Sequence, residues 1–75
     1  MHLILSSSEE EQLRNIQHYS KERWVYIRIT AVLMLHEGFA AEQVSNVLGI
    51  RPHAVSDYIC NYRSGGLQRL ISRDF

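Results

Sequence analysis

The sequence contains one cysteine, one proline and no long hydrophobic run. With Cys60 alone, no disulfide can form within the chain, which favours a reducing compartment such as the cytoplasm. No apolar stretch approaches the roughly 20 residues that a membrane-spanning helix needs, and the start lacks the basic segment of a signal peptide. We therefore expect a cytoplasmic protein without a membrane segment.

An excess of charge of either sign is also absent, because eight basic residues balance eight acidic ones. This balance argues against a protein that binds polyanions without sequence preference. The charges are unevenly spread, however. Residues 1–50 carry four basic and six acidic residues, a net charge of −2, whereas residues 51–75 carry four and two, a net charge of +2. The net positive charge of residues 51–75 favours DNA as a partner.

The length of 75 residues, 45% of them hydrophobic, suffices for one compact domain. A domain this small buries only about 60% of the surface of its unfolded chain, so oligomers are common. We expect a single domain over residues 1–75, with an apolar arm at 1–5, a helix-turn-helix motif at 40–63 and a tail at 64–75. The apolar run at 3–5 is expected to be an edge strand or an exposed arm at a homodimer contact.

Two helices are expected before the motif. The serines at 6–8 are each followed three residues later by a glutamate, so a capping box can start the first helix in any of three registers. This helix should end between residues 18 and 20. The second helix, over about 21–37, is apolar nearly all round, which is typical of a helix at the centre of a core. Gly38 should end it, with Phe39 packing back as a hydrophobic contact.

Residues 40–63 have the pattern of a helix-turn-helix. Val44, Val47 and Leu48 form one face of a short helix over about 41–48. Gly49 then supplies the left-handed conformation in which that helix can end. The next helix, over about 52–63, begins with Pro52, which fits the first helical position. The apolar face of this second motif helix is formed by Val55, Tyr58, Ile59 and Tyr62.

The spacing around Gly49 is more specific than either apolar face. Ser45, four residues earlier, is small enough for a tight helix crossing, and Val55, six residues later, is aliphatic where the helices pack. This combination is similar to the DNA-binding helix-turn-helix pattern, and an ordinary helical hairpin is the alternative. Residues 64–66 should break the last helix, and residues 67–71 should form a final amphipathic turn or begin a strand. The expected fold class is an all-α, small four-helix domain containing a helix-turn-helix.

The chain as a whole resembles the homeodomain-like N-terminal domain of mariner-like bacterial insertion-sequence transposases. The matching segments are RITAVLMLHEG at 28–38, VSNVLGI at 44–50 and YRSGGL at 62–67, and the resemblance covers about residues 5–71. It implies a DNA-binding helix-turn-helix but no transposase activity, because the catalytic domain of that family is not matched. Ala40 and Arg51 stand where the family usually has a capping Ser or Thr, and the chain is neutral where the family's domain is basic.

In such a domain the second motif helix lies in the major groove, with its N-terminal residues facing the bases. Arg51 and His53 can hydrogen-bond guanine, and Asn61 can pair with adenine. Asp57 can accept from cytosine but also repels phosphate. Each has an exposed helix face as its alternative. The candidate DNA-binding residues are Arg51, Pro52, His53, Ser56, Asp57, Asn61, Arg63 and Arg69, with Arg73 as a further phosphate contact.

Signals for other chemistry are missing from the sequence. The four histidines have no spacing that would set two metal ligands on one helical face. No nucleophile, base and orienting group are arranged for catalysis, and Cys60 is expected to be a small, half-buried residue. We therefore predict no enzyme activity, no catalytic residue, no metal site and no cofactor.

The predicted function is recognition of double-stranded DNA. The protein would act as a small bacterial transcriptional regulator or as the DNA-recognition part of a mobile-element, transposase-like system, in the cytoplasm and associated with the nucleoid. A homodimer is expected, since helix-turn-helix proteins commonly read two half-sites. The alternative is a protein-interaction adaptor or small subunit of a larger protein complex, which the neutral charge and Asp57 favour. A truncated transposase relic without a function of its own is a third possibility.

Overall fold

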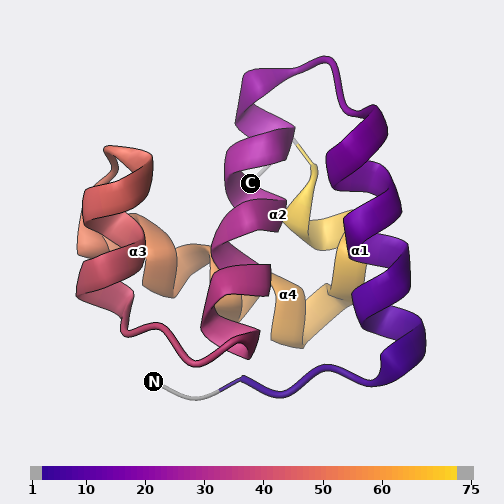
Figure 1. Ribbon diagram of the computed structural model, residues 1–75, viewed down its shortest axis with the longest axis horizontal. Helices are drawn as coiled ribbons and strands as arrows, with labels where there is room; N and C mark the ends of the chain where they lie inside the picture. Colours follow the sequence, from indigo (N-terminus) through magenta and orange to yellow (C-terminus); the bar gives the residue numbers. More distant parts are fainter. Residues whose placement is uncertain (1–2, 73–75) are drawn as a thin grey trace.

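The computed structural model describes residues 3–72, which form four helices joined by short loops (Figure 1). The helices are α1 (Ser7–Tyr19), α2 (Arg23–His36), α3 (Ala41–Leu48) and α4 (Pro52–Leu70). Within these described residues there is no strand. The predicted all-α class with four helices is therefore confirmed, and the edge strand considered for residues 3–5 is not formed.

Helix α2 is the centre of the domain. It stands between α3 and α1 in Figure 1 and packs against each of the other three helices. Its buried residues are Ile29, Ala31, Val32, Leu33 and Leu35. The nearly all-round apolar pattern correctly predicted this central position, because only a helix with neighbours on several sides can bury so many faces.

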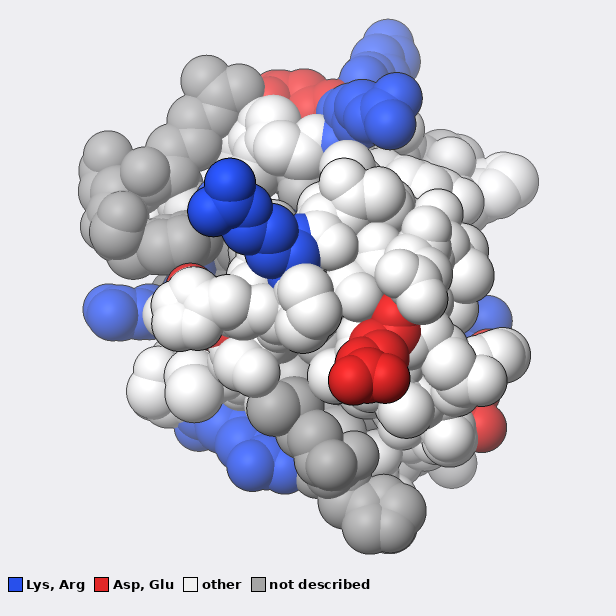
Figure 2. All heavy atoms as spheres, turned by 90° about the vertical axis from the view of Figure 1, so that its left-hand side faces the viewer, with Lys and Arg blue, Asp and Glu red and all other residues white. Residues whose placement is uncertain are grey.

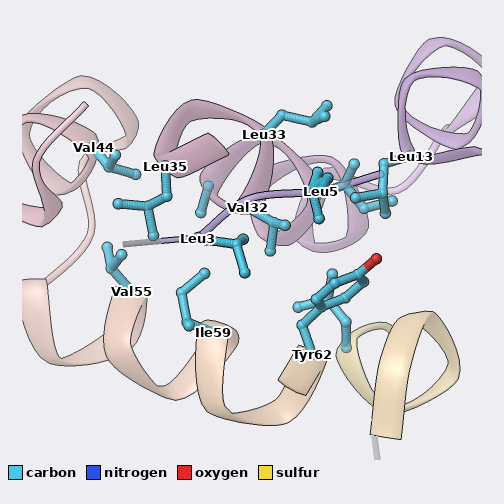
Figure 3. Packing of buried hydrophobic residues seen from close by; sticks show 13 residues of the cluster. Leu3, Leu5, Leu13, Val32, Leu33, Leu35, Val44, Val55, Ile59 and Tyr62 are labelled. Carbon is cyan, nitrogen blue, oxygen red and sulfur yellow. The ribbon is translucent and has the colours of Figure 1, made fainter. Parts of the chain in front are cut away.

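The N-terminal arm belongs to the core. Leu3 and Leu5 are only 8% and 6% exposed, whereas Ile4 between them is 84% exposed. This alternation is that of an extended chain, in which successive side chains point to opposite sides. Figure 3 shows Leu3 between α2 and α4, beside Val32 and Ile59. The prediction of an exposed arm was wrong for Leu3 and Leu5, because both side chains pack into the hydrophobic core. Met1 and His2 lie outside the described residues.

Helix α1 starts with the capping box formed by Ser6 and Glu9. The Glu9 N–H donates to Ser6 Oγ at 3.2 Å, and the Ser6 N–H donates to Glu9 Oε1 at 3.1 Å. The other carboxylate oxygen of Glu9 accepts a hydrogen bond of 2.8 Å from the Tyr62 hydroxyl. The first of the three predicted registers is thus the one used, and it also links the start of α1 to α4.

The end of α2 follows the Schellman pattern. Gly38 has a φ of 104°, its N–H donates to the Leu35 carbonyl, and the Phe39 N–H donates to the Met34 carbonyl. The predicted stop at Gly38 is confirmed. The expected packing of Phe39 is not, because its side chain is 42% exposed and only its backbone closes the helix end.

Helix α4 is broken near its end. Gly66 has a φ of 68° and a ψ of −155°, which no helix contains. The break predicted for residues 64–66 is therefore confirmed, and the residues after it form a helical turn rather than a strand. Leu70 in this turn is fully buried, so the chain folds back onto the core after Gly66.

Candidate nucleic-acid interface

The turn between α3 and α4 has the tight geometry expected of a helix-turn-helix. Gly49 is left-handed, with a φ of 69° and a ψ of 33°, and its N–H donates to the Ser45 carbonyl. The Ile50 N–H donates to the same carbonyl at 3.0 Å. Ser45 is 3% exposed, and its hydroxyl donates to the Glu42 carbonyl at 2.8 Å. The small buried residue and the glycine therefore play the parts predicted from their spacing.

Helix α4 turns one face to the core and leaves the other exposed. Val55, Ile59 and Tyr62 are buried, and Tyr58 is half-buried beneath the Arg28 guanidinium, 5.4 Å from its ring centre. Of the candidate DNA-binding residues, the structure leaves exposed Arg51, Pro52, His53, Asp57, Arg63 and Arg69, and half-buries Ser56 and Asn61. Cys60 was predicted to be half-buried but is exposed. Arg73 lies outside the described residues.

The N-terminal end of α4 carries most of the predicted base-reading groups. Arg51 occupies the N-cap position in an extended conformation, and its side chain makes no capping hydrogen bond. His53 and Asp57 lie one turn apart, with Nε2 and Oδ2 separated by 3.6 Å and both side chains largely exposed. A protonated His53 would offset the negative charge of Asp57 locally. Both side chains lie on the outer face of α4, where a ligand can reach them.

Further along α4, two candidates that are eight residues apart are brought together. Arg69 Nε donates to Asn61 Oδ1 at 3.4 Å. These two residues line a shallow hollow together with Asp57 and Cys60. The sequence predicts Asn61 as a base-reading residue and Arg69 as a separate phosphate contact. Their pairing has no local sequence signal, because it depends on the direction in which the chain turns after Gly66.

The face that carries α3 is poor in charge. Figure 2 shows it largely covered by uncharged side chains, with isolated basic and acidic groups between them. Val47 of α3 is 70% exposed, although its spacing with Val44 and Leu48 predicted an inward position. A helix of eight residues needs only Val44 and Leu48 to pack against its neighbours, so Val47 is left outside. This surface adds an apolar component beside the polar face of α4.

Comparison of the chain with protein-family profiles, with characterised proteins and with solved structures gave no match. No helix within residues 3–72 is long and apolar enough to cross a membrane. In the same range, no three His, Cys, Asp or Glu side chains are grouped so as to hold a metal ion.

Proposed function

We propose that this chain is a sequence-reading DNA-binding domain in which α4 is the recognition helix. The observation that supports this most directly is the left-handed turn at Gly49 over the buried Ser45, which leaves Arg51 and His53 exposed at the start of α4. Helix-turn-helix proteins present the N-terminal residues of their second helix to base edges in this way. A domain of the mariner-like insertion-sequence transposase kind, or a small bacterial regulator, is the class of protein in which we place it.

In the proposed complex, α4 lies in the major groove. Arg51 pairs with guanine O6 and N7, and the three arginines expected from the sequence, Arg63, Arg69 and Arg73, contact phosphates. Few cations face the DNA, so few counterions are released. With about three phosphate contacts, the logarithm of the binding constant should fall with the logarithm of salt concentration at a slope of about −3. Such weak electrostatic binding favours a homodimer that reads two half-sites.

A second candidate function is that of a protein-interaction adaptor. The observations that favour it are the few charges on the α3 face (Figure 2) and the exposure of Val47 in α3 and Phe39 just before α3. Apolar residues grouped on an uncharged surface are typical of contacts with another protein. On this reading the helix-turn-helix is a scaffold, and DNA is not the partner.

The two candidate functions are tested by selecting bound sequences from a library of DNA duplexes. Fluorescence anisotropy then measures the affinity for the enriched sequence. Arg51→Ala should weaken binding to the preferred site by about 1–3 kcal/mol and have little effect on random duplex, because a base contact provides specificity. Arg63→Ala should weaken binding to all sequences alike. Lys21→Ala, in the loop between α1 and α2, is the matched control and should leave both affinities unchanged.

Failure to enrich any duplex, with only non-specific affinity even at low salt, would reject the DNA proposal in favour of the adaptor. Sedimentation of the free protein and of its DNA complex tests the dimer separately. Two chains on a palindromic site are expected, and one chain per site would reject the dimer.

A further inference from the structure

The final turn of α4 is held in a fixed position after the break at Gly66. Leu70 is fully buried, and Arg28 Nη1 donates to the carbonyls of Leu70 and Ser72 at 3.2 and 2.9 Å. The Arg28 guanidinium also lies over the Trp24 ring, 4.8 Å from its centre. These contacts fix where residues 67–70 lie relative to the preceding part of α4.

The position of Arg69 in this turn depends on Gly65. A Cβ atom at residue 65 would lie 2.6 Å from the Cβ of Arg69, closer than real side chains approach. The stem of Arg69 therefore passes directly over Gly65, where only a glycine leaves room for it. From there its guanidinium reaches Asn61, with 3.4 Å between Nε and Oδ1. The two neighbouring glycines thus have separate roles: Gly66 provides the turn, and Gly65 provides the space.

We infer that Asn61 is a positioning residue, which orients Arg69 toward a DNA phosphate at the far end of α4. The inference deepens the proposed function and depends on it. Asn61 lies ten residues after Arg51, which at 1.5 Å per residue is about 15 Å along the helix. The major groove of DNA is about 12 Å wide. With Arg51 reading bases inside the groove, Arg69 therefore lies beyond the groove and faces the DNA backbone rather than the bases.

The test compares Asn61→Ala, Arg69→Ala and the double variant on the preferred site and on random duplex over a range of salt. Each single variant should lose affinity for both duplexes by the same factor, about fivefold to tenfold. The salt slope should become less steep by about 0.9, as expected for one lost phosphate contact. The double variant should bind no more weakly than Arg69→Ala alone.

Two further variants separate positioning from a general structural effect. Gly65→Ala should reproduce the loss, because the added Cβ displaces Arg69, and it should add nothing in an Arg69→Ala background. Gln68→Ala changes an exposed neighbour in the same turn and should bind like the original chain. In an Arg69→Lys background the charge remains but the Nε donor is gone, so Asn61→Ala should have no further effect.

The contact itself can be followed without DNA, through the NMR signal of the Arg69 Nε–H. Asn61→Ala and Gly65→Ala should shift this signal and speed its exchange with water, while Gln68→Ala should not. Effects of Asn61→Ala and Arg69→Ala that simply add, or a loss at one base pair only, would overturn the inference and make Asn61 a base reader. If the original chain binds no duplex, the proposed function fails, and the inference fails with it.

Discussion

Gly49 has the backbone conformation on which the helix-turn-helix depends. Its φ of 69° is disfavoured for residues with a β-carbon, but a Cβ built there would meet no atom within 4 Å. A side chain at residue 49 would therefore destabilise the fold by straining the backbone, and not by colliding with other atoms. We predict that Gly49→Val lowers the free energy of unfolding by about 1–3 kcal/mol, and that Gly49→Asn lowers it much less, because asparagine adopts this conformation more readily. Urea unfolding measures both, and equal losses would contradict this explanation.

Tyr62 links α4 to the start of α1 through a group that titrates. The pKa of Tyr62 is raised to about 12. Burial is the largest cause, followed by the hydrogen bond to Glu9 and then by the negative charge of Glu9. Because the folded pKa lies above the ordinary value of 10, the neutral phenol is the stabilised form. Its contribution to stability is complete below pH 10 and is lost as the pH rises through about 12.

We therefore predict that the chain loses stability between pH 10 and 12 more steeply than its Tyr62→Phe variant. The measurement is urea unfolding at several pH values, together with tyrosinate absorbance. The difference in absorbance between the two proteins isolates Tyr62. If this difference in tyrosinate absorbance appears near pH 10, the Tyr62 hydroxyl is neither buried nor bonded to Glu9.

At the level of single elements, α3 begins with an incomplete cap. Gln43 Oε1 accepts the Ala40 N–H at 2.8 Å, but Ala40 has no side chain that could accept in return. The backbone of Ala40 already has the extended conformation of an N-cap, with a φ of −75° and a ψ of 155°. We predict that Ala40→Ser completes the capping box and raises the free energy of unfolding by about 1 kcal/mol. Ala40→Val is the control in thermal unfolding, and a serine variant no more stable than the valine variant would disprove the missing cap.

The helix ends are the part of the fold that the sequence predicts best, because they depend on local chemistry. Gly49 and Pro52 mark the turn, and the glycines after residue 64 mark the break in α4. Local chemistry does not decide which of the three capping registers starts α1. The structure places Ser6 at the N-cap and Glu9 against Tyr62, which is 53 residues away in sequence. No local pattern contains that partner.

The errors concern which apolar side chains are covered, and this depends on neighbouring elements. Val47 fits a helical face by spacing, yet no other element within residues 3–72 covers it, and it is 70% exposed. Leu3 and Leu5 form no periodic pattern long enough to interpret, yet they are buried. The Asn61–Arg69 pair in the candidate interface belongs to the same class, because it arises from the direction of the chain after Gly66.

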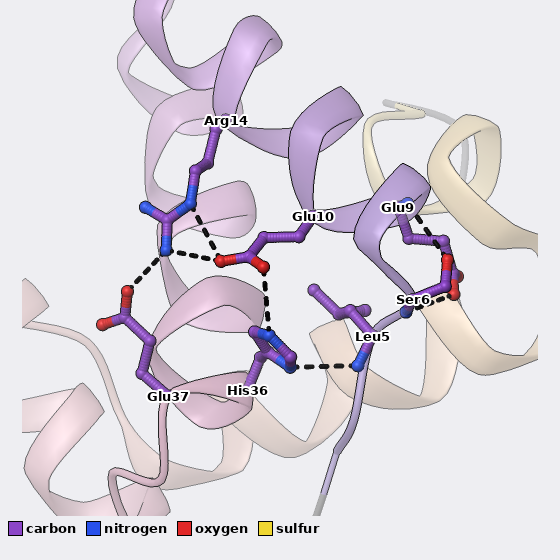
Figure 4. A network of polar contacts seen from close by, with 7 residues as sticks. All are labelled: Leu5, Ser6, Glu9, Glu10, Arg14, His36 and Glu37. Carbon is purple, nitrogen blue, oxygen red and sulfur yellow. Dashed lines mark hydrogen bonds and ion pairs between the residues drawn. The ribbon is translucent and has the colours of Figure 1, made fainter.

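For the molecule as a whole, the N-terminal arm connects the elements that the sequence presents as separate. The Leu5 N–H donates to His36 Nδ1 at 3.0 Å, at the end of α2. His36 Nε2 faces Glu10 of α1 at 3.5 Å, and Arg14 bridges Glu10 and Glu37 (Figure 4). Arg14 and Glu37 are exposed, and Glu10 and His36 are half-buried at the surface, so each ion pair contributes little by itself. The Leu5–His36 hydrogen bond is the member of this network that holds the arm, whose leucines enter the core.

The last prediction concerns how much of the stability this arm provides. A domain of 75 residues has a total free energy of unfolding of only about 4–11 kcal/mol. Leu5→Ala should remove about 2–5 kcal/mol of it, because it leaves a cavity in the core, whereas Ile4→Ala should change it by less than about 0.5 kcal/mol, because Ile4 is 84% exposed. Urea unfolding compares the two variants. If Ile4→Ala costs as much as Leu5→Ala, then Ile4 is covered in solution, as it would be in a dimer that uses the arm, and sedimentation of the Ile4→Ser variant would then show a loss of mass.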